Sequence, residues 1–422
     1  MTRKRSNIKL WDNIAHIWIN GYLDTLSEPY RDIYSPRLTI NKFKYIFKNL
    51  AADFLRLFKR TNIPEDKIWF FALTKNNYDA IEGIYRQTPN SVLVSFFRFR
   101  STINNETYYY TLRLKFFYCF IYPFLWSKYY LLNKKKAIRF YDLFFAVNGT
   151  YEESLRLLKN TSPKAIVFSN DHLIIARALL LAANDLGIKT YYVQHASVSE
   201  YFPPLEFAHA LLEGQDTLDK YKLCGAVDSF IHLVGMPKFD QYSDYINTNK
   251  SVKKIGVAFN LNDNLQSVYN FVSELKNRSI NIVIRPHPGD DRDLSIFSGF
   301  EISNSKEEGS FDFLTKIDAI IAGDSSIHLE AVHVNVYPVY FIFQRATDSR
   351  FDYYKFVKNG LVEYYKTIEE VLLLIDKLKK EKPSVQSRAN YYNATLGQKS
   401  QINSTELIVK IIDATIKSEI SE

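Results

Sequence analysis

A turn rich in phosphate-binding side chains follows an apolar segment in the second half of the sequence. Residues 281–285 predict a buried strand, and Arg285, His287 and Pro288 lie at its end within the sequence RPHPG. Ligands bind at the carboxyl ends of parallel strands, and guanidinium and imidazole groups both bond phosphate oxygens. Because the prolines restrict the backbone, we expect His287 to be held toward a ligand. The alternative is a turn whose Arg and His face solvent.

A second polar turn follows the apolar residues 319–322. Gly323 permits a tight turn, and Ser325 and Ser326 begin a predicted helix. Free N–H groups at a helix N-terminus, together with two hydroxyl groups, form an anion site. Glu330 lies one turn further and can accept hydrogen bonds from ribose hydroxyl groups. Although a serine here also serves as an ordinary helix cap, the two turns together predict a nucleotide mono- or diphosphate site.

A carboxylate occupies a comparable position in the first half of the chain. Asp171 follows residues 165–168, an apolar segment that predicts a strand. A carboxylate at a strand end can remove the proton of an acceptor hydroxyl group. An acid in the first turn of a helix is also favoured by the helix dipole alone. Asp171 therefore has both a catalytic and a structural interpretation.

The elements that position these residues alternate between strands and helices in two blocks. Strands are expected at residues 68–73, 91–97, 165–168, 190–193, 208–212 and 230–234, and again at 254–259, 281–285, 319–322 and 337–343. Such alternation is typical of α/β sheets, and the polar residues 237–254 predict a linker. We expect two Rossmann-like domains, 1–240 and 253–422, facing each other across a cleft. Helices at 368–379 and 406–416 end the second domain.

Length and composition agree with this organisation. The 422 residues exceed what one core usually organises, and 46% hydrophobic with 24% charged residues is ordinary for a folded protein. Two cysteines form neither a disulfide framework nor a Cys-based zinc site. No apolar run has the roughly 18–20 residues of a membrane span, and no signal peptide is recognisable. We therefore expect a cytoplasmic protein.

Several catalytic motifs are missing from the sequence. It has no P-loop, no G-x-S-x-G nucleophile elbow and no HExxH zinc pair. The acidic residues at 290–293 follow the His-Pro turn and do not end a strand. We expect a reaction without a metal or other cofactor, in which Arg, His and helix dipoles meet the charge of the nucleotide.

The His-Pro strand end and the Ser-Ser helix start resemble motifs of bacterial GT-B transferases of surface polysaccharide assembly. These include polysialyltransferase- and lipooligosaccharide-sialyltransferase-like enzymes, capsule Kdo transferases and CDP-glycerol glycerophosphotransferases. In them the histidine and serines hold the donor phosphate, a role that the resemblance implies for His287, Ser325 and Ser326. Residues 233–240 are similar to the G-x-P-R-x-D segment of such enzymes, with Lys238 in place of arginine. The resemblance implies that Gly235 in this segment contacts the nucleotide.

Two further segments resemble catalytic turns of these enzymes. His195, in the sequence QHA, is similar to a QHG turn with Ala196 in place of glycine. The resemblance implies a catalytic base or an acceptor-orienting residue, and a capping or core histidine is the alternative. Glu213 precedes Gly214 as in the acidic pair of sialyltransferases, although Leu212 stands where the first acid would be. Asp171, His195 and Glu213 are thus candidates for one base.

The resemblance implies an inverting glycosyltransferase with a nucleotide-sugar donor and a glycan or lipid-linked acceptor. A CMP-sugar is the first expectation for the donor. A CDP-polyol phosphotransferase of teichoic-acid-like or capsule synthesis shares both motifs, and UDP-sugars are also compatible. A nucleotide-sugar-binding scaffold without catalytic activity is the alternative from another functional class.

Residues 96–139 combine aromatic and basic side chains, with Glu106 as their one acid. Aromatic rings suit a membrane interface, and each lysine or arginine gains about 1 kcal/mol beside anionic lipid. We therefore expect peripheral contact with the cytoplasmic face of the inner membrane. A buried helix pair with solvated basic faces is the alternative. A nucleic-acid surface is not expected, because no recognisable nucleic-acid-binding motif accompanies the segment.

Overall fold

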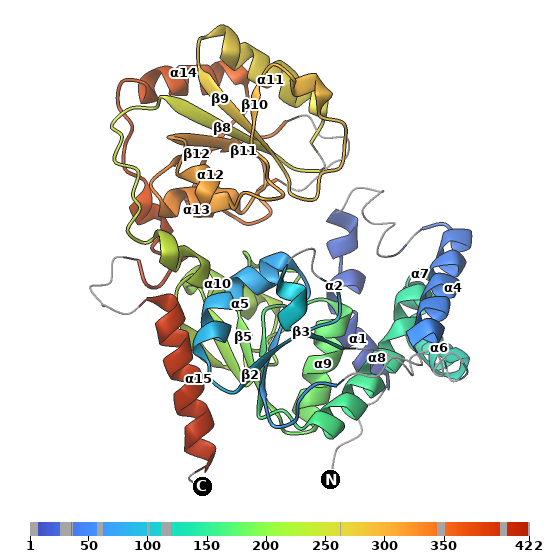
Figure 1. Cartoon of the computed structure of the whole chain (residues 1–422). Helices are drawn as coiled ribbons and strands as arrows, with labels where there is room; N and C mark the ends of the chain where they lie inside the picture. Colours follow the sequence, from blue (N-terminus) through green and yellow to red (C-terminus); the bar gives the residue numbers. More distant parts are fainter. Residues whose placement is uncertain are drawn as a thin grey trace. The chain divides into compact units, whose positions relative to one another are not determined.

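The chain folds into two compact units. The computed structural model describes residues 7–25, 35, 37–56, 62–98, 102–110, 120, 122–261, 263–343, 351–396 and 403–420. Unit 1 comprises residues 1–237 and 402–422, and unit 2 comprises residues 238–401. Each unit is built around one parallel sheet flanked by helices (Figure 1). No helix in the described ranges has the length and apolarity to cross a bilayer.

The sheet of unit 1 has seven parallel strands in the order β3-β2-β1-β4-β5-β6-β7. Its strands are β1 (Ile68–Phe71), β2 (Ser91–Ser95), β3 (Thr107–Tyr109), β4 (Ala165–Phe168), β5 (Lys189–Val193), β6 (His209–Leu212) and β7 (Phe230–Leu233). The central strands β1, β4 and β6 are buried along their whole length. Short continuous apolar segments are what a parallel sheet covered on both faces requires.

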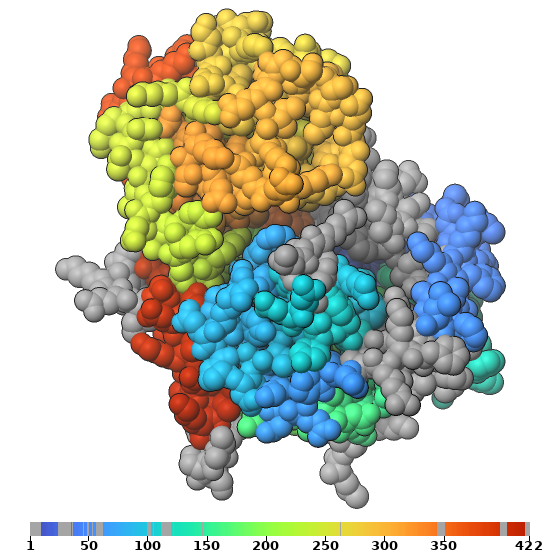
Figure 2. All heavy atoms as spheres, in the orientation of Figure 1, coloured from blue at the N-terminus to red at the C-terminus, as the bar shows by residue number. Residues whose placement is uncertain are grey.

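Helices cover both faces of this sheet. The helices of unit 1 are α1 (Asn7–Ile14), α2 (His16–Ile19), α4 (Thr39–Arg56), α5 (Lys75–Gln87), α6 (Tyr122–Leu132), α7 (Lys134–Arg139), α8 (Tyr141–Thr161), α9 (Ile174–Asp185), α10 (Gln215–Cys224) and α15 (Ser404–Ile420). Of these, α4, α6 and α7 pack against α8. The long helix α9 is almost entirely buried. Helix α4 lies at the surface of unit 1, as Figure 2 shows in blue.

Helix α15 differs from the expectation. We expected the last helix to complete the second domain, within residues 253–422, but the structure places it in unit 1. Ile408 and Ile412 are fully buried in one apolar cluster with Phe70 and Tyr78 of unit 1. The hydroxyl of Thr415 also lies 2.6 Å from that of Tyr191 on β5. The helix therefore closes the face of the first sheet.

Unit 2 has six parallel strands in the order β10-β9-β8-β11-β12-β13. They are β8 (Lys254–Phe259), β9 (Asn281–Pro286), β10 (Glu301–Ile302), β11 (Ala319–Ala322), β12 (Tyr337–Phe341) and β13 (Glu363–Tyr365), with α11 (Leu265–Asn277), α12 (Ser310–Leu314), α13 (Ile327–His333) and α14 (Ile368–Leu378). Counted within the unit, the order is 3-2-1-4-5-6. Its direction reverses between β8 and β11, the place where such sheets bind ligands.

Candidate functional site

The two polar turns of unit 2 are connected through the end of β8. Strand β8 lies between β9 and β11, and Asn260 follows it directly. The Asn260 side chain donates a 2.6 Å hydrogen bond to the carbonyl of Asp324 in the β11 turn. Arg292, beyond the β9 turn, donates to the carbonyl oxygens of Asn260 and Asp263 at 3.1 and 2.7 Å. Three strand-end loops thus form one polar surface at the reversal point of the sheet.

His287 is exposed at this surface and its tautomer is determined by a neighbour. Its Nδ1 accepts a 3.0 Å hydrogen bond from the Gly289 backbone N–H. Nδ1 therefore carries no proton, and Nε2–H is a donor. Atoms packed around the ring desolvate it and lower the pKa of His287, with Asp290 opposing the shift. A neutral imidazole with an outward N–H can donate one hydrogen bond to a phosphate oxygen. Pro288 is exposed in the same turn.

The serines precede the short helix α13. Ser325 and Ser326 are half-buried, and Gly323 is buried before them. The Ser325 hydroxyl accepts the Ile327 N–H at 3.3 Å, while Ser326, the N-cap residue of α13, forms no side-chain capping hydrogen bond. The backbone carbonyl of Gly323 lies 2.9 Å from Nε2 of His328, and this contact fixes the position of the glycine. Burial lowers the pKa of His328 to about 4, so this contact is with a neutral ring.

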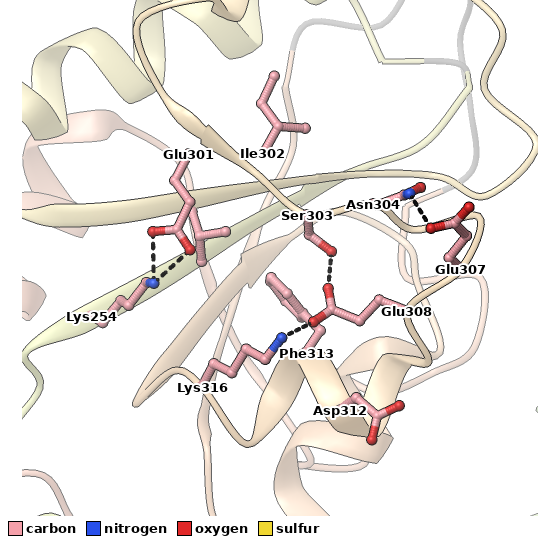
Figure 3. A pocket seen from close by; sticks show the side chains of 11 residues that line it. Lys254, Glu301, Ile302, Ser303, Asn304, Glu307, Glu308, Asp312, Phe313 and Lys316 are labelled. Atoms are coloured by element: carbon pink, nitrogen blue, oxygen red, sulfur yellow. Dashed lines mark hydrogen bonds and ion pairs between the residues drawn. The ribbon is translucent and has the colours of Figure 1, made fainter.

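The structure corrects the role that we expected for Arg285. Its guanidinium does not extend into the turn but is buried, donating to the Ser303 hydroxyl at 2.7 Å and the Glu308 carbonyl at 2.9 Å. Glu308 also pairs with Lys316. Figure 3 shows Ser303, Glu308 and Lys316 in the wall of a hollow of about 590 Å³ beside β10. The charge of Arg285 is thus neutralised within the unit and is not presented to phosphate.

Glu330 is also placed differently from the expectation of a ribose contact. It is buried on α13 and accepts a 2.5 Å hydrogen bond from Nζ of Lys238. Burial alone would raise the pKa of Glu330, but the charge and hydrogen bond of Lys238 lower it overall. The lysine that replaces arginine in the G-x-P-R-x-D-like segment is therefore the partner of Glu330. The ion pair fixes α13 to the start of unit 2.

Gly235 belongs to unit 1 and precedes this ion pair in the chain. Its φ of +82° lies in the left-handed region that favours glycine. A side chain at this position would strain the turn after β7. This backbone requirement explains the glycine without a bound nucleotide, so its predicted nucleotide contact stays a prediction.

Unit 1 brings the three candidate bases to the carboxyl ends of adjacent strands. Asp171 follows β4, His195 follows β5 and Glu213 follows β6. All three are buried. His195 stacks on His172, with ring centroids 6.1 Å apart. Among the described residues, no group of three His, Cys, Asp or Glu side chains is arranged to hold a metal ion.

Asp171 is too deeply buried to touch an acceptor in this structure, which corrects its expected direct role. Only 1% of the residue is exposed. Its Oδ2 accepts from the Tyr221 hydroxyl at 2.5 Å, and its Oδ1 lies 2.9 Å from Nδ1 of His172. Burial would raise the pKa of Asp171, but hydrogen bonds and charge from His172, with the Tyr221 hydrogen bond, lower it overall. The carboxylate stays ionised.

Glu213 forms hydrogen bonds with the residue that precedes His195. The Gln194 side chain accepts from the Glu213 backbone N–H at 2.9 Å and donates to its carboxylate at 3.2 Å. This reciprocal pair joins the ends of β5 and β6 and fixes the backbone on which His195 stands. The geometry gives Gln194 and Glu213 a supporting part beside the two histidines.

Sequence reasoning missed His172, Tyr221, Asn260 and Arg292. His172 was visible beside Asp171, but nothing in the sequence indicates which of two adjacent side chains faces outward. Tyr221 contacts Asp171 from 50 residues away. Asn260 had a usable signal, because it is a polar residue directly after an apolar strand.

Comparison with known proteins identifies the fold. No protein-family model and no curated protein matches the sequence. A UDP-GlcNAc 2-epimerase from Neisseria meningitidis, bound to UDP-GlcNAc, is similar with a TM-score of 0.52 and 13% identity, covering 82% of this chain and 100% of that chain. The wall teichoic acid polymerase TagF has a TM-score of 0.51 and 12% identity, covering 91% and 100%. The glycotransferase of kitacinnamycin is similar with a TM-score of 0.53 and 10% identity, covering 84% of this chain and 100% of that chain.

At these identities the similarity concerns the fold alone. The neighbours share the arrangement of two Rossmann-like units, each with a parallel sheet, that the strand orders show here. The predicted fold class is therefore confirmed: the chain has the GT-B fold.

Proposed function

We propose that the protein is a glycosyltransferase that moves a sugar from a nucleotide-activated donor to a growing bacterial surface glycan. The observation that carries this proposal is the polar surface at the reversal point of unit 2. There, His287 presents a neutral N–H donor after β9, and the serine turn follows β11 on the other side of β8. The transfer is metal-independent and inverting, with a single displacement at the anomeric carbon. The proton acceptor lies at the carboxyl edge of the unit 1 sheet, where Asp171, His172, His195 and Glu213 cluster.

Neutral donors suit the phosphate that leaves with the nucleotide. Negative charge grows on that phosphate as the glycosidic bond breaks, and donors fixed in advance stabilise it most. His287 is held by its turn, and Ser325 and Ser326 by the start of α13. The donor nucleotide is CMP as a first choice, because the His-Pro and Ser-Ser pair resembles the motifs of CMP-sugar transferases.

A CDP-polyol phosphotransferase is the second candidate. It is favoured by the similarity to the wall teichoic acid polymerase TagF, which covers 91% of this chain. The same donor surface serves both reactions, because a cytidine nucleotide phosphate leaves in each. The reactions differ in the attacked atom, which is the anomeric carbon for a sugar and phosphorus for a polyol phosphate.

Thermal unfolding with CMP, CDP, UDP and GDP tests the donor site. A bound nucleotide at about 100 times its Kd adds about 2.7 kcal/mol to stability and raises Tm by several degrees. His287→Ala and Ser326→Ala should reduce this shift. Ser298→Ala, an exposed serine on the opposite side of unit 2's strands, is the matched control. If no nucleotide raises Tm, the donor-site proposal is wrong.

Turnover then separates the candidate functions. Wild-type protein is incubated with a CMP-sugar, CDP-glycerol or UDP-GlcNAc, and nucleotide release is measured. Release from the CMP-sugar supports the glycosyltransferase, and release from CDP-glycerol supports the phosphotransferase. Binding of nucleotides without turnover of any donor identifies the non-catalytic scaffold instead.

Peripheral membrane contact is a separate part of the proposal, and helix α4 enlarges the surface expected for it. Exposed apolar side chains on α4 and α6 include Ile40, Phe43, Phe47, Phe54, Leu55, Phe124, Leu131 and Leu132. Exposed lysines accompany them at Lys44, Lys48, Lys128, Lys134 and Lys135. This combination fits an anionic lipid surface. Residues 99–101, 111–119 and 121 of the predicted segment lie outside the described residues.

Part of the predicted aromatic segment has a structural role. Tyr110 and Tyr129 are buried, and Trp126 donates to the Ala137 carbonyl at 2.9 Å. On the inner side of α4, Lys42 pairs with Asp142 at 2.7 Å and fixes the helix to α8. The membrane proposal therefore rests on the exposed side chains of α4, α6 and the start of α7.

Co-sedimentation with vesicles tests this surface. We expect binding to vesicles of phosphatidylglycerol and phosphatidylcholine, and a loss of binding when Lys128, Lys134 and Lys135 are changed to Glu. The matched control changes the exposed Lys377, Lys379 and Lys380 of unit 2 to Glu. Equal loss in both triple variants, or no vesicle binding by the wild type, would contradict the proposal.

A further inference from the structure

The turn after β4 separates two adjacent polar side chains. The Asn170 side chain accepts the backbone N–H groups of His172 and Leu173 at 3.3 and 2.9 Å. This Asx turn directs Asp171 into the core, while the side chain of His172 retains 18% of its exposure. One carboxylate oxygen and one ring nitrogen still meet at 2.9 Å. A buried carboxylate thus supports a histidine at the surface.

The buried carboxylate determines which nitrogen of His172 carries the proton. Asp171 stays ionised and has no proton to donate, so the contact requires a proton on Nδ1 of His172. Nε2 is then the basic nitrogen. The second carboxylate oxygen is occupied by the Tyr221 hydroxyl. Burial and the charge of Asp171 raise the pKa of Tyr221 well above its ordinary value, so the phenol remains a donor and the carboxylate cannot rotate freely.

Neighbouring rings fix the orientation of the imidazole. His172 packs against Phe202 with centroids 4.8 Å apart and stacks on His195 with an interplanar angle of 24°. Within the described part of the chain, no hydrogen bond to Nε2 of His172 is formed. His195 and Glu213 are more deeply buried at the same edge. His172 is therefore the imidazole of this cluster that an acceptor can reach.

We propose that His172 is the general base of the transfer and that Asp171 is its positioning residue. The inference rests on the proposed function and identifies the proton acceptor for it. Nε2 takes the proton of the acceptor hydroxyl as its oxygen forms a bond to the anomeric carbon. The bond to the nucleotide phosphate breaks in the same step, and the phosphate leaves with the electron pair. His172 afterwards releases the proton to water.

Asp171 acts only through His172. A carboxylate on Nδ1 keeps the basic nitrogen directed outward and stabilises the imidazolium that forms, as in other carboxylate–histidine pairs. Removing the negative charge while keeping the shape, as in Asp171→Asn, allows the ring to adopt the opposite tautomer. The structure therefore assigns His172 and Asp171 a shared step in which Tyr221 holds the pair in place.

The test compares turnover with donor binding in variants of the pair. Turnover uses the donor that the wild type accepts among a CMP-sugar, CDP-glycerol and UDP-GlcNAc, and binding uses the corresponding free nucleotide. We expect His172→Gln to lower kcat by about 10²–10⁴-fold while the nucleotide Kd stays within about twofold. His232→Gln, a histidine on β7, is the control with unchanged kcat. Near-normal kcat in His172→Gln overturns the proposal.

Chemical rescue distinguishes a base from a structural residue. In His172→Ala, added imidazole should restore part of kcat, whereas a variant that is merely misfolded is not restored. Asp171→Asn should lower kcat by at least about tenfold with an unchanged Kd, since only the orientation of the base is lost. A wild-type kcat in Asp171→Asn would show that Asp171 does not position His172.

A measurement without turnover keeps this inference separate from the proposed function. In ¹⁵N-histidine-labelled protein, the signal that disappears in His172→Gln should show a protonated Nδ1 and a bare Nε2. If the wild type turns over no donor, the proposed function is wrong. The ¹⁵N spectrum then still tests the pairing of His172 with Asp171. A bare Nδ1 with protonated Nε2 overturns the pairing itself.

Discussion

The carboxyl edges of the two sheets differ in how their charged side chains are arranged. In unit 2 the charged groups near the edge are withdrawn into ion pairs, Arg285 with Glu308 and Lys238 with Glu330. The imidazole of His287, which is neutral, stays exposed after β9, and two half-buried serines follow β11. In unit 1 the carboxylate of Asp171 is buried, yet it acts on the surface through His172. The edge of unit 2 therefore suits the binding of a phosphate group, whereas the edge of unit 1 suits the transfer of a proton.

The largest expected effect comes from breaking the ion pair beneath the edge of unit 2. Lys238→Met leaves the carboxylate of Glu330 buried without its partner. The loss should be about 3 kcal/mol in the free energy of unfolding of unit 2, since an unpaired buried charge is costly. Residues Trp11, Trp18, Trp69 and Trp126, the 4 tryptophans of the chain, all lie in unit 1.

Two probes in urea can therefore assign this loss to one unit. Tryptophan fluorescence follows unit 1, and circular dichroism follows both units. We expect only the dichroism transition to move to lower urea in Lys238→Met. A shift of the fluorescence transition alone would show that the pair does not stabilise unit 2.

The next effect contrasts binding with turnover. His287→Ala should weaken nucleotide binding by about ten- to hundredfold, which corresponds to the loss of one hydrogen bond to a charged group. At saturating donor, kcat should fall less than it does in His172→Gln. Calorimetric titration and initial rates measure the two quantities. If His287→Ala and His172→Gln lower the nucleotide affinity equally and leave kcat unchanged, donor binding and proton transfer are not separated between the two sheet edges.

A smaller effect concerns pH. The pKa of Glu330 in the folded state is held below its ordinary value of 4.5. The stability that this contributes is present above about pH 4.5 and is lost as pH falls through the lower, folded-state value. The double variant Lys238→Met, Glu330→Gln lacks this contribution. Its unfolding free energy should decline less than that of the wild type between pH 5 and pH 3, measured in urea by circular dichroism.

The smallest expected effect tests the corrected role of Arg285. Changing Arg285→Met and Glu308→Gln together removes both charges of the pair. Because the guanidinium contacts Ser303 and Glu308 rather than the turn, the nucleotide Kd should stay within about twofold of the wild type. A tenfold rise in Kd, in a variant that unfolds normally, would restore Arg285 to the phosphate site.

The sequence was sufficient for most of the sheet framework. Apolar segments such as 254–259 and 319–322 are bounded by polar turns, and the structure has strands over the same residues. Helices α5, α8 and α10 were not predicted. Their apolar positions are interrupted by polar residues that become buried, such as Asn148, Glu153 and Ser154 on α8.

The corrected residues depend on contacts between distant parts of the chain. Lys238 and Glu330 are 92 positions apart, and Arg285 meets Ser303 and Glu308 at separations of 18 and 23. A local pattern identifies a charged residue but not its partner. The direction of His172 likewise depends on the Asx turn at Asn170 and on Tyr221. The predicted nucleotide contacts of His287, Ser325 and Ser326 stay predictions.

The return of α15 to unit 1 has a consequence for synthesis of the protein. Ile408 and Ile412 fill the core that Phe70 and Tyr78 begin more than 300 positions earlier. As the chain leaves the ribosome, helix α5 can already pack on that face, but the part that α15 covers stays exposed while all of unit 2 is being made. Unit 1 reaches its final core only after translation of its last helix, so unit 2 can complete its folding first.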